Sequence, residues 1–399
     1  MPDVCLYFQV HQPYRLRRYG LFDVGRRSDY FDDAANEAIL RKVAARCYLP
    51  ASALLRDLVE RHDGRFRLAL SITGTALEQL ARWCPEALEA FRALAATGCV
   101  EVLAETSHHS LVALEDAAEL DAQVAAHAAR VAAELGAAPR VFRNTELIAS
   151  DAIAAHVAAR GYAGLLTEGP ERALGWRSPH FAYASAAAPG LGLLLRSRRL
   201  SDDVAFRFAD PAWPERPLTA EKLAGWVHAV RGDVVGLFMD YETLGEHQPA
   251  ESGIFELVRR LPAAILAAAE GGFVTPSEAL GRLPRAGTVA LPEAVSWADE
   301  ARDLSAWLGN AMQRSAQRGL YELLGPVRAA GDAALLEDWR RLSTSDHVYY
   351  MCTKRFADGD VHRYFSPHGS PYEAYIGFTN ALCDVALRAG VRGWRPPEG

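Results

Sequence analysis

Short apolar runs of strand length alternate with longer helical patterns along the first 285 residues of the chain. The apolar runs occupy positions 4–10, 66–73, 99–104, 141–142, 163–167, 191–195, 234–239 and 273–275. Helical patterns lie between them, most clearly at 34–60, with an interruption near Pro50, at 75–96, at 116–135 and from about 151. This alternation predicts a mostly parallel sheet of about seven strands. Because polar groups repeatedly follow the strands, a closed or nearly closed barrel is favoured over an open sheet.

Beyond Pro292 the strand pattern ends and helical periodicity takes over. Positions 299–324, 332–342 and 371–389 carry it. We therefore expect two parts without a long linker: a barrel over residues 1–285, and a helical region over residues 286–399 that packs on the barrel.

Composition narrows the choice of partners. Half of the residues are hydrophobic, 23% are charged, and the formal net charge is −7, which is ordinary for a globular protein. A mildly acidic chain without a basic stripe predicts no binding to nucleic acid or to an anionic membrane. A neutral substrate fits this charge better.

Three further features indicate the compartment. The amino terminus carries Asp3 and no basic residue before its apolar run, unlike a secretory signal. No stretch approaches the length of an apolar membrane span. The six cysteines are scattered and form no C-x-x-C pair, which is typical of a reducing compartment. We expect a cytoplasmic protein.

The densest group of ionisable side chains follows the apolar run at 234–239. Asp240 stands at its end, and Glu242, Glu246 and His247 come within the next seven positions. Barrel enzymes build their sites at the carboxyl ends of parallel strands, so this segment is a candidate site. The alternative is a polar loop that only caps the next helix.

A second acid, Glu146, follows the run at 141–142, so it could face Asp240 across the end of a barrel. Two carboxyl groups in different environments are what glycoside cleavage needs, one ionised and one protonated. A separation of about 5–5.5 Å would give retention of configuration, and a wider gap would give inversion. The alternative is two acids in unrelated salt bridges.

The adjacent histidines, the tryptophans and the search for known motifs add less to the description of the candidate site. Adjacent residues on a strand point to opposite faces, so His108 and His109 cannot both bind one metal without a turn, and we predict no metal and no cofactor. Trp297 could offer a flat surface to a sugar ring, whereas Trp307 has the spacing of a core residue. No glycine-rich phosphate loop, G-x-S-x-G elbow or H-E-x-x-H pair occurs.

Five segments, taken in order, resemble the motifs of glycoside hydrolase family 57: FQVHQPYR, GCVEVLAETSHHSL, VFRNTEL, GLFMDYETLGEHQ and STSDHVYYM. The segments SWADEARDLSAWLGN and SPYEAYIGF extend the resemblance to the shorter, α-amylase-like branch. The resemblance implies an incomplete seven-stranded (β/α) barrel of distorted TIM type, a helical region that completes the site, and retaining chemistry on α-1,4-glucans or maltooligosaccharides.

The same resemblance implies individual roles. Glu146 falls on the nucleophile and Asp240 on the general acid and base. The positions that fall within motifs shaping the sugar site are His11, Glu101, His109, Glu242 and Asp346. Cys99 is a departure, because the family often has glutamine there.

Two other functions remain open within the resemblance. One is a 4-α-glucanotransferase or glycogen branching enzyme, although the chain does not contain the large β-sandwich domain of the family's glucanotransferases. The other is a catalytically silent carbohydrate-binding protein. A metal-dependent deacetylase on a similar barrel is a third hypothesis, and it needs a histidine pair at helical or turn spacing that the sequence does not contain.

Overall fold

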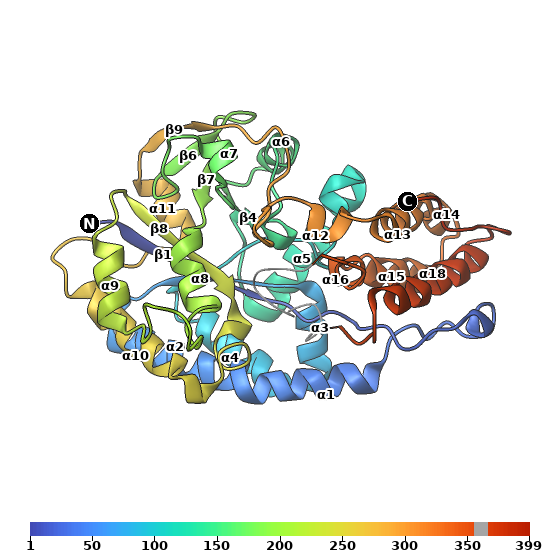
Figure 1. Cartoon of the computed structure of the whole chain (residues 1–399), viewed down its shortest axis with the longest axis horizontal. Coiled ribbons are helices and arrows are strands. Elements are labelled where there is room, and N and C mark those ends of the chain that lie inside the picture. The colour runs from blue at the N-terminus through green and yellow to red at the C-terminus, as the bar shows by residue number, and fades with distance from the viewer. Residues whose placement is uncertain (355–365) are drawn as a thin grey trace.

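The computed structural model describes residues 1–354 and 366–399, and its centre is a ring of parallel strands (Figure 1). The strands of the ring are β1 (Asp3–Val10), β2 (Leu68–Ile72), β3 (Val100–Val102), β4 (Val141–Arg143), β5 (Gly164–Thr167), β7 (Gly192–Leu195) and β8 (Val234–Asp240). They form two parallel ladders, in the order β3-β2-β1-β8 and β4-β5-β7. Each of these strands coincides with an apolar run in the sequence.

Two single bridges join the ladders into a barrel. One pairs Ala104 with Phe142, just beyond β3, and the other pairs Arg196 with Gly236, between β7 and β8. At the second seam the backbone N–H of Ser197 donates to the carbonyl of Gly236 at 2.7 Å. A Cβ added at Gly236 would lie only 2.4 Å from the carbonyl oxygen of Leu195, so glycine allows the close approach of the two strands. The barrel is therefore seven-stranded and only narrowly closed, as expected.

Two strands outside the ring extend its second ladder. β6 (Ala182–Ser185) pairs antiparallel with β7, and β9 (Arg285–Val289) pairs with β6. Neither was predicted, because β6 is short and β9 carries an arginine and a glycine in place of an apolar run. The apolar run at 273–275 forms only a single bridge, between Val4 and Phe273. Thr275 then caps the next helix, α11 (Pro276–Arg282).

Helices cover the outside of the barrel. They are α3 (Gly74–Trp83), α4 (Pro85–Ala95), α5 (Ala117–Leu135), α6 (Asp151–Ala159), α7 (Glu171–Leu174), α8 (Arg198–Ala205), α9 (Ala220–His228) and α10 (Ile254–Leu266). The helices begin at capping residues that the sequence supplies. The side chain of Asp116 accepts from the backbone N–H of Glu119 in α5, and that of Ser150 accepts from the backbone N–H of Ile153 in α6.

The interruption expected near Pro50 is a π-helical turn and not a break in the helix. Helix α1 (Asp33–Val43) continues through a π-helical turn, η2 (Ala44–Tyr48), into α2 (Leu49–Arg61). Pro50 lies in the first turn of α2 and has no backbone N–H to donate to the π-helical turn before it. The interruption is therefore a wider turn before the proline, a feature often found near functional sites.

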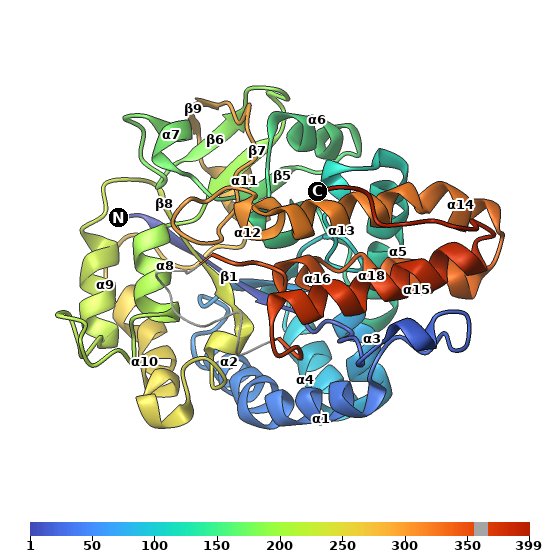
Figure 2. The same cartoon turned by 45° about the vertical axis from the view of Figure 1, so that its right-hand side comes forward.

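The C-terminal part is helical, as expected. Its helices are α12 (Ser305–Leu308), α13 (Ala311–Glu322), α14 (Leu324–Ala329), α15 (Ala333–Leu342), α16 (Ser345–Tyr349) and α18 (Pro371–Arg388). Figures 1 and 2 show them together on one side of the barrel, with α12 and α16 nearest to it. Trp307 is buried in their core, which confirms its packing role.

Ion pairs and a long loop hold this region on the barrel. Glu119 on α5 is buried and receives hydrogen bonds from Arg340 at 2.6 Å and Arg328 at 3.0 Å. The segment after β1 reaches α18, where Gly25 N and Tyr30 Oη donate to the two carboxyl oxygens of Asp384. The proposed division at residue 285 remains a prediction. Within the described residues no helix is both long and apolar enough to cross a bilayer.

Candidate active site

The predicted site residues, apart from Glu101, come together beyond the carboxyl ends of the barrel strands. His11 follows β1, and His109 lies in the loop after β3. Glu146 follows β4, and Asp240 ends β8 with Glu242 two residues later. Asp346 comes from helix α16 of the C-terminal region. The helical region therefore supplies one side of the site.

Glu146 is held by a donor on each carboxyl oxygen. Nε2 of His109 lies 2.8 Å from Oε1, and the indole N–H of Trp297 donates to Oε2 at 2.6 Å. Burial raises the pKa of Glu146, but the hydrogen bond and charge of His109, the charge of Arg143 and the Trp297 hydrogen bond outweigh it and lower the pKa. This carboxyl is therefore ionised near neutral pH.

The pKa of Asp240 is shifted in the opposite direction to that of Glu146. Burial, followed by the negative charge of Glu146, raises its pKa to about 7, although Arg143 and His109 act in the other direction. Both causes follow from position, since Asp240 is the last residue of a buried strand and lies near enough to the ionised Glu146 to be affected by its charge. At pH values below about 7 the Glu146–Asp240 pair thus consists of one carboxylate and one carboxylic acid.

The backbone at Glu146 and at its partner His109 is unusual. Both have positive φ, 56° and 51°, a region that residues with a Cβ adopt at a cost. Two residues in direct hydrogen bond contact thus share a strained conformation. Such strain concentrates where a fold fixes a reactive side chain.

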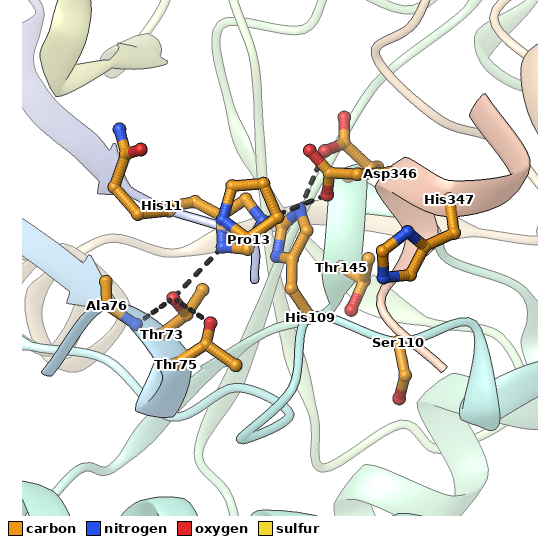
Figure 3. Close-up of polar contacts among 12 residues, drawn as sticks. His11, Pro13, Thr73, Thr75, Ala76, His109, Ser110, Thr145, Asp346 and His347 are labelled. Atoms are coloured by element: carbon orange, nitrogen blue, oxygen red, sulfur yellow. Dashed lines mark hydrogen bonds and ion pairs between the residues drawn. The ribbon is translucent and has the colours of Figure 1, made fainter. Parts of the chain in front are cut away.

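His11 connects the barrel to the helical region. Its ring nitrogens lie 3.0 Å from Thr73 Oγ1 and 3.0 Å from Asp346 Oδ2, as Figure 3 shows. Burial and the nearby charge of His109 lower the pKa of His11. We therefore assign a neutral ring that donates to Asp346 through Nε2 and accepts from Thr73 through Nδ1. The pKa of the Asp346 carboxyl is lowered, because the hydrogen bond from His11 and the charge of His109 outweigh burial.

His109 lies behind the nucleophile candidate. Its side chain is 1% exposed, and its ring stacks on that of His11 with centroids 4.0 Å apart (Figure 3). Its Nδ1 lies 3.6 Å from Oε2 of Glu105, a buried acid. Burial lowers its pKa, but Glu105 and Glu146 outweigh burial and raise the pKa to about 9. His109 is therefore a cation between two carboxylates.

The two glutamates that follow Asp240 after β8 have different partners. Glu242 stays at the site, where the Tyr48 hydroxyl donates to it, and burial together with the charge of Asp240 raises its pKa to about 8. Glu246 turns away and pairs with Lys42 at 2.6 Å and Arg46 at 3.8 Å. The π-helical turn η2 contributes both Tyr48 and Arg46. His247 is half-buried, and its partial removal from water lowers its pKa to about 4.

The structure does not bring Glu101 to this cluster. Its carboxyl accepts from the backbone N–H of Ser277 at 2.8 Å and from the Ser277 hydroxyl, at the start of α11. The reason is its register, since Glu101 lies in the middle of β3 and not beyond its end. Glu105, from the same sequence motif, stands beside His109 instead.

Sequence reasoning assigned no role to Glu105 or Arg143, although both follow apolar runs. Arg143 ends β4 and is fully buried, and no side-chain nitrogen of it has a hydrogen bond partner in the described structure. Its guanidinium carbon lies 5.0 Å from the centre of the Trp297 ring. Arg143 thus places a positive charge near both candidate acids. The N–H of Trp297 donates to Glu146, and the sequence-based idea that its ring offers a flat surface to a sugar stays a prediction.

One group of side chains has the composition of a metal site. Ligand atoms of His11, His109 and Asp346 lie within 4.8 Å of one another. Their ring nitrogens already face Thr73, Asp346, Glu146 and Glu105. In addition, the two rings are stacked, so their nitrogens do not converge on one point. The arrangement suits a hydrogen-bonded ion-pair network better than a metal.

Comparison with known proteins adds independent findings. The family model described as glycosyl hydrolase family 57 matches residues 5–292. A protein of Methanocaldococcus jannaschii named "Putative alpha-amylase" is 38% identical over 393 residues, which cover 94% of this chain and 82% of that protein.

Solved structures resemble the fold at lower identity. A branching enzyme from Pyrococcus horikoshii has a TM-score of 0.66 at 16% identity, covering 100% of this chain and 98% of that one. A 4-alpha-glucanotransferase from Thermococcus litoralis has a TM-score of 0.65 at 14% identity, and the match covers 87% of this chain but only 56% of that enzyme. The alpha-amylase AmyC from Thermotoga maritima has a TM-score of 0.59 at 12% identity, covering 98% and 97% of the two chains.

Proposed function

Because this chain belongs to glycosyl hydrolase family 57, we propose that it cleaves α-1,4-glucans with retention of configuration. The enzyme is a glycoside hydrolase, and its substrates in this proposal are maltooligosaccharides and longer α-glucans. Glu146 is the proposed nucleophile and Asp240 the proposed general acid and base.

In the first step Glu146 attacks the anomeric carbon while the bond from that carbon to the leaving oxygen breaks. Asp240 passes its proton to the leaving oxygen, so the departing sugar leaves as a neutral alcohol. The product is a glycosyl ester on Glu146, and Asp240 is now a carboxylate.

In the second step water enters on the side from which the sugar left. Asp240 takes a proton from this water as its oxygen attacks the anomeric carbon, and the electron pair of the ester bond returns to Glu146. Two inversions give net retention. A sugar hydroxyl in place of water would give transfer.

The observation that carries the proposal is the opposed state of the two acids. The pKa of Glu146 is lowered, whereas burial and the charge of Glu146 raise the pKa of Asp240 to about 7. A nucleophile must be ionised and an acid must be protonated at the same pH, and this pair meets both conditions.

Three further groups fit the recognition of a neutral sugar. His11, Glu242 and Asp346 combine an imidazole with two carboxyl groups around the proposed acids. Such groups accept and donate hydrogen bonds to hydroxyls, and the chain has no strong positive charge excess that would favour a charged substrate. Their role in binding the sugar is part of the proposal.

The test follows products and their configuration. Wild-type protein and Glu146→Gln are incubated with maltoheptaose and with amylose, and products are separated by chromatography while proton NMR follows the first anomer formed. Shorter sugars released as the α-anomer by the wild type, with turnover at least about a thousandfold lower in Glu146→Gln, are expected.

Other outcomes have defined meanings. Longer or branched products would assign a transferase. The first product appearing as the β-anomer would exclude retention. Glucan binding without any product would assign a silent binding protein, and turnover of Glu146→Gln within tenfold of wild type would remove the proposed nucleophile.

A further inference from the structure

A chain of buried polar groups runs behind Glu146 into the centre of the barrel. The Tyr7 hydroxyl donates to Gln9 Oε1 at 2.9 Å, and Ser71 Oγ donates to the same oxygen at 3.0 Å. The amide of Gln9 then lies 3.4 Å from both carboxyl oxygens of Glu105. This network fixes the orientation of Glu105 without supplying it a full positive charge.

The positive partner of Glu105 is His109. Oε2 of Glu105 lies 3.6 Å from Nδ1 of His109, while Nε2 of the same ring lies 2.8 Å from Glu146. Glu105 is 0% exposed and His109 is 1% exposed, so water screens this ion pair little. A buried carboxylate at this place favours the imidazolium over the neutral ring.

We propose that Glu105 is a positioning residue for the reaction, which keeps His109 protonated and thereby keeps Glu146 a weakly basic carboxylate that leaves readily from the glycosyl ester. No proton passes through His109 in this scheme. Its N–H stays directed at Glu146 Oε1 while the ester bond forms and breaks. The inference rests on the proposed function, because it assigns Glu146 as the nucleophile.

The imidazolium of His109 mainly affects the second step of the reaction, in which the glycosyl ester on Glu146 breaks down. When the bond between the anomeric carbon and Glu146 breaks, the electron pair returns to a carboxyl group already bonded to His109 and Trp297. A hydrogen bond from a charged donor stabilises this developing carboxylate more than one from a neutral ring. The same bond makes Glu146 a weaker nucleophile in the first step, so loss of the charge slows ester breakdown more than ester formation.

Other charged groups around His109 do not replace Glu105. The charge of Arg143 disfavours protonation of His109. The stacked ring of His11 has a lowered pKa, and the charge of His109 is one cause of that lowering. Asp346 is engaged with His11 at 3.0 Å. Asp240 lies near His109 but has a raised pKa, so below about pH 7 it adds little negative charge. Among the described carboxylates, Glu105 and Glu146 are the two that form ion pairs with the ring of His109.

The first measurement is the titration of His109 in the full chain. Protein labelled with ¹³C at histidine Cε1 is titrated by NMR, and the His109 signal is identified, among the twelve histidines, as the one missing from His109→Gln. The wild-type signal is expected to titrate at about 9. Glu105→Gln is expected to lower that value by at least about one pH unit.

The control is Ser71→Ala, which removes a hydrogen bond from the same buried network but no charge. It is expected to lower thermal stability and to leave the His109 titration in place. Glu105→Asp keeps the charge and is expected to restore most of the wild-type value, which separates charge from packing.

The second measurement separates the two chemical steps. With α-maltosyl fluoride, whose good leaving group makes ester breakdown limiting, Glu105→Gln is expected to lower kcat about 10- to 100-fold. KM should fall with it, kcat/KM should change far less, and intact mass spectrometry of quenched enzyme should show more glycosyl adduct.

The outcomes distinguish this inference from the proposed function. A wild-type His109 that titrates at its ordinary value of 6.5, or a Glu105→Gln titration equal to wild type, would overturn it whether or not the enzyme turns over. Equal losses in kcat and kcat/KM without adduct would overturn it too. Because the wild-type titration does not depend on Glu105→Gln, a Glu105→Gln protein that fails to fold leaves this test intact. Failure of the proposed function is read separately, from Glu146→Gln.

Discussion

At the scale of single residues, the site works by separating the protonation of two acids. Glu146 is surrounded by donors, His109 and Trp297, and by the charge of Arg143, all of which favour its carboxylate. Asp240 is largely removed from water and is affected by the charge of that carboxylate, so its pKa is raised and its proton is retained up to about pH 7. The charge of one acid therefore sets the protonation of the other, and the two titrate as a pair.

This coupling predicts the pH dependence of cleavage. Because burial and Glu146 raise the pKa of Asp240 to about 7, its acid form is lost as pH rises above that value, and kcat/KM for maltoheptaose should fall about tenfold per pH unit there. Asp240→Asn should remove this alkaline limb and lower kcat/KM for maltoheptaose about 100- to 10,000-fold. Rates are measured from pH 4 to 10 by reducing-sugar release.

The control for Asp240→Asn is a substrate with a better leaving group, α-maltosyl fluoride. Formation of the ester from α-maltosyl fluoride needs little acid catalysis, so Asp240→Asn should keep most of its first-step rate with that substrate. Equal losses with the fluoride and with maltoheptaose would contradict the role of Asp240 as the acid.

Glu146 and Asp240 stood out as candidates in the sequence because each lies at the end of an apolar strand or within three residues of it. Glu101 and Glu105 could not be distinguished in this way, since they lie in one motif and only the length of β3 decides which of them reaches His109. The role of Trp297 was not predictable either, because its N–H meets Glu146 across 151 positions of the chain.

At the scale of elements, the barrel is closed at its weakest points by single bridges. The seam between β7 and β8 consists of the Arg196–Gly236 bridge and depends on backbone contact at Gly236. It lies in the same strand as Asp240, four residues before the end. The position of Asp240, the proposed general acid, is thus tied to the closure of the ring.

Gly236→Ala should therefore weaken the barrel. The new methyl group would stand 2.4 Å from the Leu195 carbonyl oxygen, so backbone must move. We expect a loss of at least about 1–3 kcal/mol in the free energy of unfolding, measured by urea denaturation followed by circular dichroism.

The control is another glycine whose added methyl group meets nothing. Gly225 lies within helix α9 with open space around it, and Gly225→Ala should be neutral or stabilising by up to about 1 kcal/mol. If both substitutions had the same effect, the seam would not depend on close approach at Gly236.

The seven ring strands were predictable because buried parallel strands are almost wholly apolar. The π-helical turn η2 was not, since the residues Ala44–Tyr48 fit an ordinary helix and their shift depends on contacts with the loop after β8. β9 was missed because its residues are mostly exposed and carry no strand pattern.

At the scale of the whole molecule, the helical region is docked through charge as well as apolar packing. Glu119 on α5 stands between Arg340 and Arg328, and Arg341 pairs with Glu78 on α3. Helical periodicity predicted these helices, but no local pattern shows which acid 200 positions away each arginine meets. Docking matters for the site, because Asp346 belongs to this region.

Glu119→Ala should loosen the docking. The substitution leaves two arginines without their buried carboxylate, and breaking a buried pair of this kind costs about 3–5 kcal/mol at most. We expect a lower urea midpoint and a higher KM, because Asp346 loses its fixed place beside His11.

Glu256→Gln provides the comparison, since the Glu256–Arg260 pair is exposed on α10 and is worth less than about 1 kcal/mol. A KM for Glu119→Ala equal to that of Glu256→Gln would show that the site is insensitive to the docking of the helical region.

The hydrogen bond between His11 and Asp346 joins positions 335 residues apart. During synthesis on the ribosome, a chain can therefore fold most of its strands while this pair is still missing. A product of early termination or cleavage between Asp240 and Asp346 would keep Glu146 and Asp240 but would lack the partner of His11. A site that begins at the eleventh residue is therefore completed only after position 346 has been synthesised.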